Sequence, residues 1–308
     1  MNIRRCIFCK KTKSNFSNGN DWSIEHIIPL SLGNHTLITN DVCKNCNNKL
    51  GQNVDSHFVN CLPIAMKRLV LGLKGESGKL PQPFKEGVDQ FGNTIHVDEH
   101  FNVTVVPSLR QEGDHFKGTA PSKEQAKRMI ETRLKRNHYP SEVISDALEQ
   151  IEATEIQSYQ PTGSFRIAYE PARISLFILK IAYEYACLRL GALYFKDKRG
   201  EEIRNVLFDA INDKYKNKCP TIRGVGVAPE EISICLNIAE NLNLHMIMLH
   251  PDRVNHLICE IFLFCDKSTA FSVIVSDNAT QYMPLPPHDI DVIPASPQSF
   301  SNNPDNEA

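Results

Sequence analysis

Two pairs of cysteines with the same spacing most constrain how this 308-residue chain can fold. Cys6 and Cys9 form one CxxC pair, and Cys43 and Cys46 form the other. Each CxxC turn presents two thiolates from one tight bend, and zinc takes four such ligands in a tetrahedron. The 33 residues between the pairs exceed the usual zinc-ribbon spacing. We therefore expect a structural zinc site, with a folded segment that returns the chain to the first pair.

The six remaining cysteines stand among apolar residues, as buried thiols do. We expect them to fill the core: Cys61, Cys187, Cys219, Cys235, Cys259 and Cys265. The start of the chain, "MNIRRCIFCKK", lacks the apolar region of a secretory signal. No apolar run approaches the roughly 20 residues that span a bilayer, since "ISLFILKIAYEYACL" contains Lys180 and Glu184. The sequence therefore predicts a cytoplasmic protein without a membrane segment.

Charge is distributed unevenly along the chain. Residues 1–75 hold ten basic and four acidic residues, a net charge of +6, whereas residues 224–308 hold two basic and eleven acidic residues, a net charge of −9. A basic N-terminal end suits a polyanionic partner, although chance segregation of solvated charge gives the same composition. The candidate nucleic-acid contacts flank the first cysteine pair: Arg4, Arg5, Lys10, Lys11 and Lys13.

The stretch "SIEHIIPLSLGN" places a carboxylate, Glu25, next to an imidazole, His26, inside the cysteine frame. Histidine accepts a proton near neutral pH. Asn47 follows Cys46 on the first turn of an expected helix and faces back toward this stretch. A carboxylate and an amide oxygen suit magnesium or manganese and leave positions for water and a phosphate oxygen. Such a set of groups can hydrolyse a phosphodiester, although an isolated Glu–His pair is more often a surface feature.

The run "EHIIPLSLGN", Asn40 in "TNDVC", and "CKNCNNKLG" together resemble the HNH endonuclease motif, the ββα-metal fold, in its zinc-stapled form. The resemblance covers residues 6 to about 58. It implies that His26 is the general base and that Asn40 braces the loop and orients His26 through a hydrogen bond. Glu25 and Asn47 would ligate the catalytic Mg²⁺ or Mn²⁺, with Asn48 as an alternative to Asn47. The four paired cysteines would hold the structural zinc.

The sequence as a whole predicts an α+β protein. A small zinc-stapled ββα domain comes first, and a mixed helical domain with a C-terminal antiparallel sheet follows. The expected domains are a nuclease domain at 1–75, an α+β domain at 76–283 and a disordered, proline-rich tail at 284–308. Apolar periodicity and capping residues predict helices at 56–75, 122–136, 140–156, 171–195 and 201–213. Alternating apolar runs predict strands within 94–106 and at 244–249, 257–264 and 270–276.

These features favour a metal-dependent endonuclease that hydrolyses DNA. One alternative is a zinc-stapled nucleic-acid-binding module that does not cut. A third interpretation adds a regulated assembly, in which residues 90–283 bind a protein partner or sense a signal and the nuclease is the effector of a prokaryotic defence system. The basic helix at 123–136 is either a solvated face or a phosphate contact.

Overall fold

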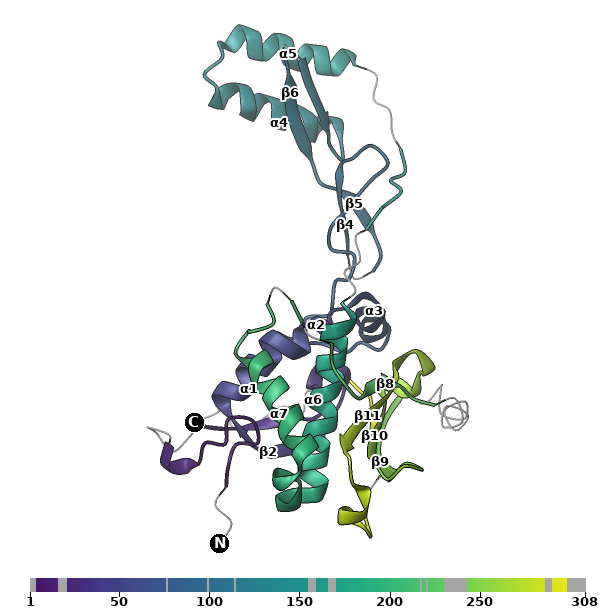
Figure 1. Ribbon diagram of the computed structural model, residues 1–308. Helices are drawn as coiled ribbons and strands as arrows, with labels where there is room; N and C mark the ends of the chain where they lie inside the picture. The colour runs from purple at the N-terminus through teal and green to yellow at the C-terminus, as the bar shows by residue number, and fades with distance from the viewer. Residues whose placement is uncertain are drawn as a thin grey trace, which may run out of the picture. The chain divides into compact units, whose positions relative to one another are not determined.

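The computed structural model describes residues 4–15, 21–75, 77–98, 100–113, 115–154, 159–165, 170–216, 218–219, 221–229, 243–285 and 290–297. The chain divides into two compact units, and Figure 1 labels helices and strands of each. Unit 1 comprises Met1–Pro81 and Tyr169–Ala308, and unit 2 is Gln82–Ala168. Unit 2 is thus inserted into the chain of unit 1.

Unit 1 begins with the expected ββα arrangement. β1 (Trp22–His26) pairs with β2 (Ile38–Cys43) in antiparallel register, and α1 (Lys44–Leu50) follows directly. Short helical turns precede β1 and lie in the β1–β2 loop: η1 (Lys13–Asn15) and η2 (Leu30–Leu32). A π-helical turn, η3 (Gly51–Asp55), extends α1 into α2 (Ser56–Val59).

The helix predicted over 56–75 is interrupted after Val59, and α3 (Leu62–Val70) begins a new one. Pro63 lies in the first turn of α3. Proline suits this position because its missing N–H would have no helical partner there. The start of a new helix after Val59 therefore agrees with the position of Pro63 in the sequence.

The second half of unit 1 joins two helices to a sheet. α6 (Pro171–Leu190) and α7 (Lys198–Ile211) are linked by η4 (Gly191–Lys196). The sheet has the order β12-β9-β10-β11-β8 and every neighbouring pair is antiparallel. Its strands are β8 (Val225–Val227), β9 (Leu244–Pro251), β10 (Leu257–Phe262), β11 (Ala270–Ser276) and β12 (Ile290–Pro294), with η6 (Leu263–Cys265), η7 (Lys267–Thr269) and η8 (Ala279–Tyr282) in the connections.

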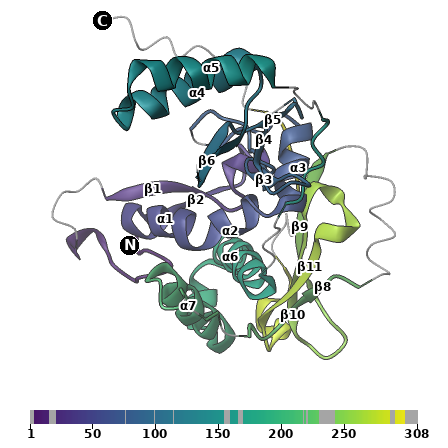
Figure 2. The ribbon, with the colours of Figure 1, turned by 90° about the horizontal axis from the view of Figure 1, so that it is seen from above.

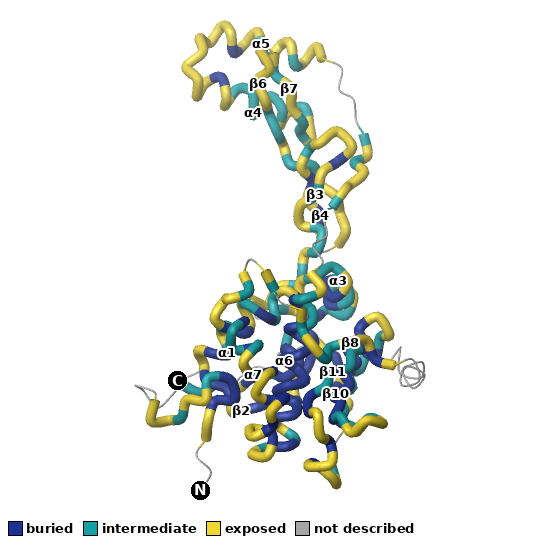
Figure 3. Tube along the Cα trace, viewed as in Figure 1, coloured by how far each residue is buried: buried dark blue, intermediate teal, exposed yellow. Residues whose placement is uncertain are grey.

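The helix α6 is the centre of unit 1. Figure 2 shows it between the ββα segment and the C-terminal sheet, and Figure 3 shows it buried along most of its length. Phe58 of α2 stacks on Phe177 of α6 with ring centroids 4.1 Å apart. The apolar side chains of the ββα segment thus belong to one core with α6 and the sheet. This shared core is why the compact units differ from the predicted division at residue 75.

Unit 2 contains two small sheets and a pair of helices. β3 (Gly87–Val88), β4 (Thr94–Val97) and β5 (Val103–Val105) form one sheet, and β6 (Ser108–Glu112) and β7 (His115–Thr119) form a hairpin. α4 (Lys123–Arg136) packs on α5 (Ser141–Ala153). The Ser122 side chain accepts a hydrogen bond from the backbone N–H of Gln125, so the predicted helix start is confirmed.

The α+β class and the C-terminal antiparallel sheet are confirmed. Five of the six unpaired cysteines lie in or against the core, and Cys235 lies outside the described residues. Across the described ranges, no helix combines the length and the apolarity that crossing a membrane requires.

The expectation of a disordered tail is wrong for residues 290–297. β12 pairs with β9 as an edge strand, and Ile293 and Ala295 are buried. The prolines of this segment did not exclude a strand, because Pro294 stands at its last position, where a missing donor is tolerated. Residues 286–289 and 298–308 lie outside the described part of the chain.

The contact between this tail and the β1–β2 loop gives a stability prediction. Gly33 and Gly72 both have positive φ, +92° and +68°, which costs an alanine about 1–2 kcal/mol. A Cβ added at Gly33 would lie 2.7 Å from the backbone nitrogen of Ser296, whereas the nearest atom at Gly72 is 4.0 Å away. We expect overpacking to make Gly33→Ala about 1–3 kcal/mol more destabilising than Gly72→Ala in urea unfolding. Equal losses would contradict this contact.

Candidate active site and zinc cluster

Four cysteine sulfurs converge where the β1–β2 hairpin meets α1. Cys6 and Cys9 come from the N-terminal turn, Cys43 ends β2 and Cys46 lies in the first turn of α1. All four sulfurs lie within 4.8 Å of one another, and the Sγ atoms of Cys9 and Cys43 are 3.8 Å apart. A zinc tetrahedron with bonds of about 2.3 Å has edges of about 3.8 Å. The cluster fits a structural zinc ion.

The four sulfurs interact closely with one another. The backbone N–H of Cys43 donates to the sulfur of Cys6. Hydrogen bonds among the four side chains lower the pKa of Cys9 and Cys43 and raise the pKa of Cys6 and Cys46. The thiolate is the form that binds metal, so zinc binding would release the protons that remain on the cluster.

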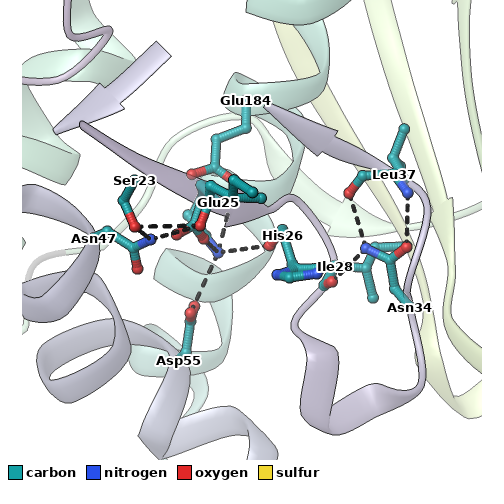
Figure 4. A network of polar contacts seen from close by, with 11 residues as sticks. Ser23, Glu25, His26, Ile28, Asn34, Leu37, Asn47, Asp55 and Glu184 are labelled. Carbon is teal, nitrogen blue, oxygen red and sulfur yellow. Dashed lines mark hydrogen bonds and ion pairs between the residues drawn. The ribbon is translucent and has the colours of Figure 1, made fainter. Parts of the chain in front are cut away.

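Asn47 lies against β1, as Figure 4 shows. Its Nδ2 donates to the Ser23 hydroxyl at 2.8 Å and to the Ile24 carbonyl at 2.9 Å. A carbonyl can only accept, so the amide nitrogen must face it and the Asn47 Oδ1 remains as an acceptor. Asn48 is exposed and lines a separate cavity beside Cys9 and Cys43. Asn47 is therefore the asparagine that faces the hairpin.

Glu25 is buried and paired with a lysine from α6. Its Oε1 lies 2.5 Å from the ammonium nitrogen of Lys180, whose side chain has no solvent exposure. Asp55 at the end of η3 and Glu184 on α6 approach the same nitrogen at 3.2 and 3.5 Å. The backbone carbonyl of His26 accepts from it at 3.4 Å. Figure 4 shows this network, in which β1, η3 and α6 meet at one positive charge.

The ammonium and the carboxylates of this network attract each other, whereas the carboxylates repel one another. Burial lowers the pKa of Lys180, but the negative charges of Asp55, Glu184 and Glu25 outweigh burial, so the pKa of Lys180 lies well above its ordinary value. For Glu184, burial is the larger effect and raises its pKa well above the ordinary value, against the opposing charge of Lys180. Removing one partner of a buried pair typically costs about 3–5 kcal/mol. Lys180 therefore keeps its positive charge at neutral pH, and its removal alone should destabilise unit 1.

Lys180 was not among the site residues predicted from the sequence. The signal was present in α6, where Lys180 and Glu184 lie four residues apart in a stretch of buried apolar and aromatic residues. A charged i, i+4 pair in such a helix needs buried partners. The sequence could indicate that partners exist, but it could not indicate that β1 and η3 supply them.

The loop between β1 and β2 is braced by Asn34. This buried side chain donates to the carbonyls of Ile28 and Leu37 at 2.6 and 2.9 Å, and its Oδ1 accepts from the Leu37 N–H at 2.8 Å. Asn40, to which the resemblance gave the bracing role, has an exposed side chain on β2. A hydrogen bond from Asn40 that orients His26 stays a prediction.

His26 is the last residue of β1 and is half-buried. Glu25, the residue before it, is buried, so His26 is the more exposed of the two residues at this strand end. Its position allows proton transfer with a water or substrate oxygen.

The predicted nucleic-acid contacts differ in their surroundings. Arg4 forms an ion pair with Asp41 at 3.4 Å and lies over the Trp22 ring at 4.2 Å. Lys10 pairs with Glu201 at 2.9 Å. The remaining basic residues are exposed and have no ion pair within the described part of the chain: Arg5, Lys11 and Lys13.

Residues 6–63 match the family model described as HNH endonuclease. The matched segment contains the four cysteines, Glu25, His26 and Asn47, and it agrees with the resemblance seen in the sequence. Comparison of the chain with curated proteins and with solved structures gave no match. The family match supports nuclease activity at the family level and implies a nucleic acid as the substrate.

The cysteine cluster gives a prediction about metal content. Cys43→Ser should remove zinc and unfold the ββα segment, because binding of a structural zinc supplies about 10 kcal/mol or more to folding. Cys61→Ser is the matched control, since Cys61 lies outside the cluster and a serine suits its N-cap position. Elemental analysis should find about one zinc per chain in the native protein and in Cys61→Ser. Native protein without zinc would contradict the site.

Proposed function

We propose that this protein is a metal-dependent HNH endonuclease that hydrolyses DNA phosphodiester bonds. The observation that carries the proposal is the contact of the Asn47 amide with β1. It holds a ligand oxygen beside the strand that ends in Glu25 and His26, within the segment that matches the nuclease family.

The donor set suits the catalytic ion that the resemblance implies. Glu25 offers a carboxylate and Asn47 offers its Oδ1, and oxygen ligands of this kind suit Mg²⁺ or Mn²⁺. When bound, such an ion would neutralise charge on the scissile phosphate. The two residues hold few of its positions, which leaves room for water and phosphate oxygens.

His26 supplies the base in this proposal. Its neutral ring accepts a proton from the attacking water, and the protonated ring is stabilised by nearby phosphate charge. Asn40 orients the ring, as the resemblance implies. The basic residues around the first cysteine pair bind the DNA backbone, and the residues of β1 and α1 carry out the hydrolysis.

A nucleic-acid-binding module without cleavage is the second candidate. The observation that favours it is the 2.5 Å contact between Glu25 and Lys180, because this ammonium offsets part of the charge that would bind a cation. The two candidates differ in one measurement, which is cleavage of DNA in the presence of magnesium.

We also propose a cytoplasmic location and a role as the effector of a prokaryotic defence system. In this proposal residues 90–283 contact a protein partner or a signal. The inserted unit 2 supports this part, because it has its own sheets and helix pair and the active-site residues all belong to unit 1.

Replacing the base tests the chemistry. His26→Ala should reduce plasmid nicking about 10²- to 10⁴-fold, because the proton of the attacking water loses its acceptor. Zinc content and unfolding temperature should remain those of the wild type, since the His26 ring is not part of the core. Cleavage should also stop in wild-type protein when magnesium is withheld.

His57→Ala is the matched control, because His57 is exposed on α2 and outside the Lys180 network. It should nick at the wild-type rate. Near-normal nicking by His26→Ala would remove His26 from the mechanism, and no nicking by the wild type on any DNA would favour the binding module.

Salt dependence tests the DNA path. Each phosphate contact contributes about 0.9 to the slope of log K against log salt. Replacing Arg5, Lys11 and Lys13 by alanine should flatten the slope by up to about 2.7, measured with His26→Ala protein so that the DNA stays intact.

The control is the same replacement on α4, at Arg128, Arg133 and Arg136, which line a cavity of about 830 Å³ in unit 2. We expect this variant to keep the slope. A slope that falls with the α4 variant instead would assign the DNA path to unit 2.

A further inference from the structure

We propose that Lys180 is a positioning residue of the nuclease site: its ammonium group fixes the end of β1 and thereby the places of Glu25 and His26. This inference rests on the proposed function. It gives a role in the site to a residue that lies outside the segment that matches the nuclease family. Lys180 touches neither water nor substrate, because its side chain has no solvent exposure.

The ammonium group binds two consecutive residues of the strand in different ways. It contacts the side chain of Glu25 at 2.5 Å and the backbone carbonyl of His26 at 3.4 Å. A side-chain contact alone would let the strand end rotate about its axis, and a backbone contact alone would leave the carboxylate free to change rotamer. Both together fix the direction in which the His26 ring leaves the strand.

The strand end needs such an anchor. β1 and β2 form a sheet of only two strands, and the last pair of their register is His26 with Ile38. A two-stranded hairpin alone is marginally stable in water. The zinc cluster holds the opposite end, where Trp22 pairs with Cys43. Asn34 braces the loop beyond this pair, and Lys180 is the charged anchor of the strand end itself.

The anchor is itself held rigidly. Lys180 lies in the middle of the 20-residue helix α6, with buried residues before and after it. Asp55 contacts the same ammonium at 3.2 Å from the π-helical turn η3, so the segment after α1 is tied to the same point. Asn47 on α1 and Glu25 on β1, the two proposed metal ligands, are therefore positioned through one shared group.

The test removes the positive charge without leaving an unpaired negative charge on the same helix. Lys180→Met combined with Glu184→Gln replaces the two members of this buried ion pair on α6 by neutral side chains of similar size. Mn²⁺ binding is measured by electron paramagnetic resonance of the free ion, with zinc-loaded, full-length protein and no DNA. Cleavage is then measured over a range of DNA concentrations.

We expect Mn²⁺ to bind about 10- to 100-fold more weakly, because the ligand carboxylate loses the group that orients it. We expect kcat to fall by a similar factor and KM for DNA to stay unchanged, since DNA contacts are elsewhere. Lys180→Gln with Glu184→Gln keeps an N–H donor near Glu25 and should recover part of the Mn²⁺ affinity. This second variant separates positioning from packing, and it carries the test if the methionine variant does not fold.

Arg173→Met with Glu170→Gln is the matched control. Arg173 is a buried cation on α6 whose contacts are Glu170 and the carbonyls of Tyr215 and Lys216, away from β1. It should change stability without changing Mn²⁺ affinity. Unchanged or tighter Mn²⁺ binding in the Lys180 variants would overturn the inference, because tighter binding means that Lys180 competes with the metal for Glu25. Failure of the wild type to cut DNA would overturn the proposed function alone, since Mn²⁺ binding is measured without cleavage.

Discussion

The interaction on which unit 1 depends is the burial of one ammonium group, that of Lys180, among carboxylates from three elements. A buried charge is tolerated only when it is paired and hydrogen-bonded. Lys180 therefore requires Glu25 from β1 and Asp55 from η3, and these acids in turn require Lys180. The ββα segment and α6 must consequently be assembled together. This mutual requirement explains why residues 1–81 form one compact unit with residues 169–308 although unit 2 separates them in the chain.

The hairpin is held at its two ends by different chemistry. At one end the cysteine cluster joins β2 and α1 to the N-terminal turn, which fits a zinc ion. At the other end Lys180 binds Glu25 and the His26 carbonyl. A metal ion can clamp a small segment that has too little core of its own. The lysine adds a charged link to α6, whereas the cysteines themselves pack in the apolar core that the ββα segment shares with α6 and the sheet.

The features predicted correctly from the sequence depend on local spacing. The start of α4 at Ser122 and the side of α1 that carries Asn47 follow from residues close to one another in the chain, and the cysteine cluster follows from two short CxxC motifs that one metal ion can join. The missed features depend on contacts across long separations. Lys180 is 155 residues from Glu25, and β12 is ordered by its pairing with β9. The bracing of the loop by Asn34 was also missed, because it depends on which carbonyls the folded loop presents.

An asparagine at position 47 has a structural role in addition to its suitability as a magnesium ligand. Its Nδ2 donates to the carbonyl of Ile24, and its Oδ1 is the atom left for a cation. An aspartate would be a more strongly charged ligand, but it would place an acceptor against the Ile24 carbonyl and lose the bond that holds α1 to β1. The amide is therefore the side chain that can join helix and strand with one end and offer an oxygen with the other. Because Glu25 shares its charge with Lys180, the proposed site would combine a partly neutralised carboxylate with a neutral second ligand whose position is fixed.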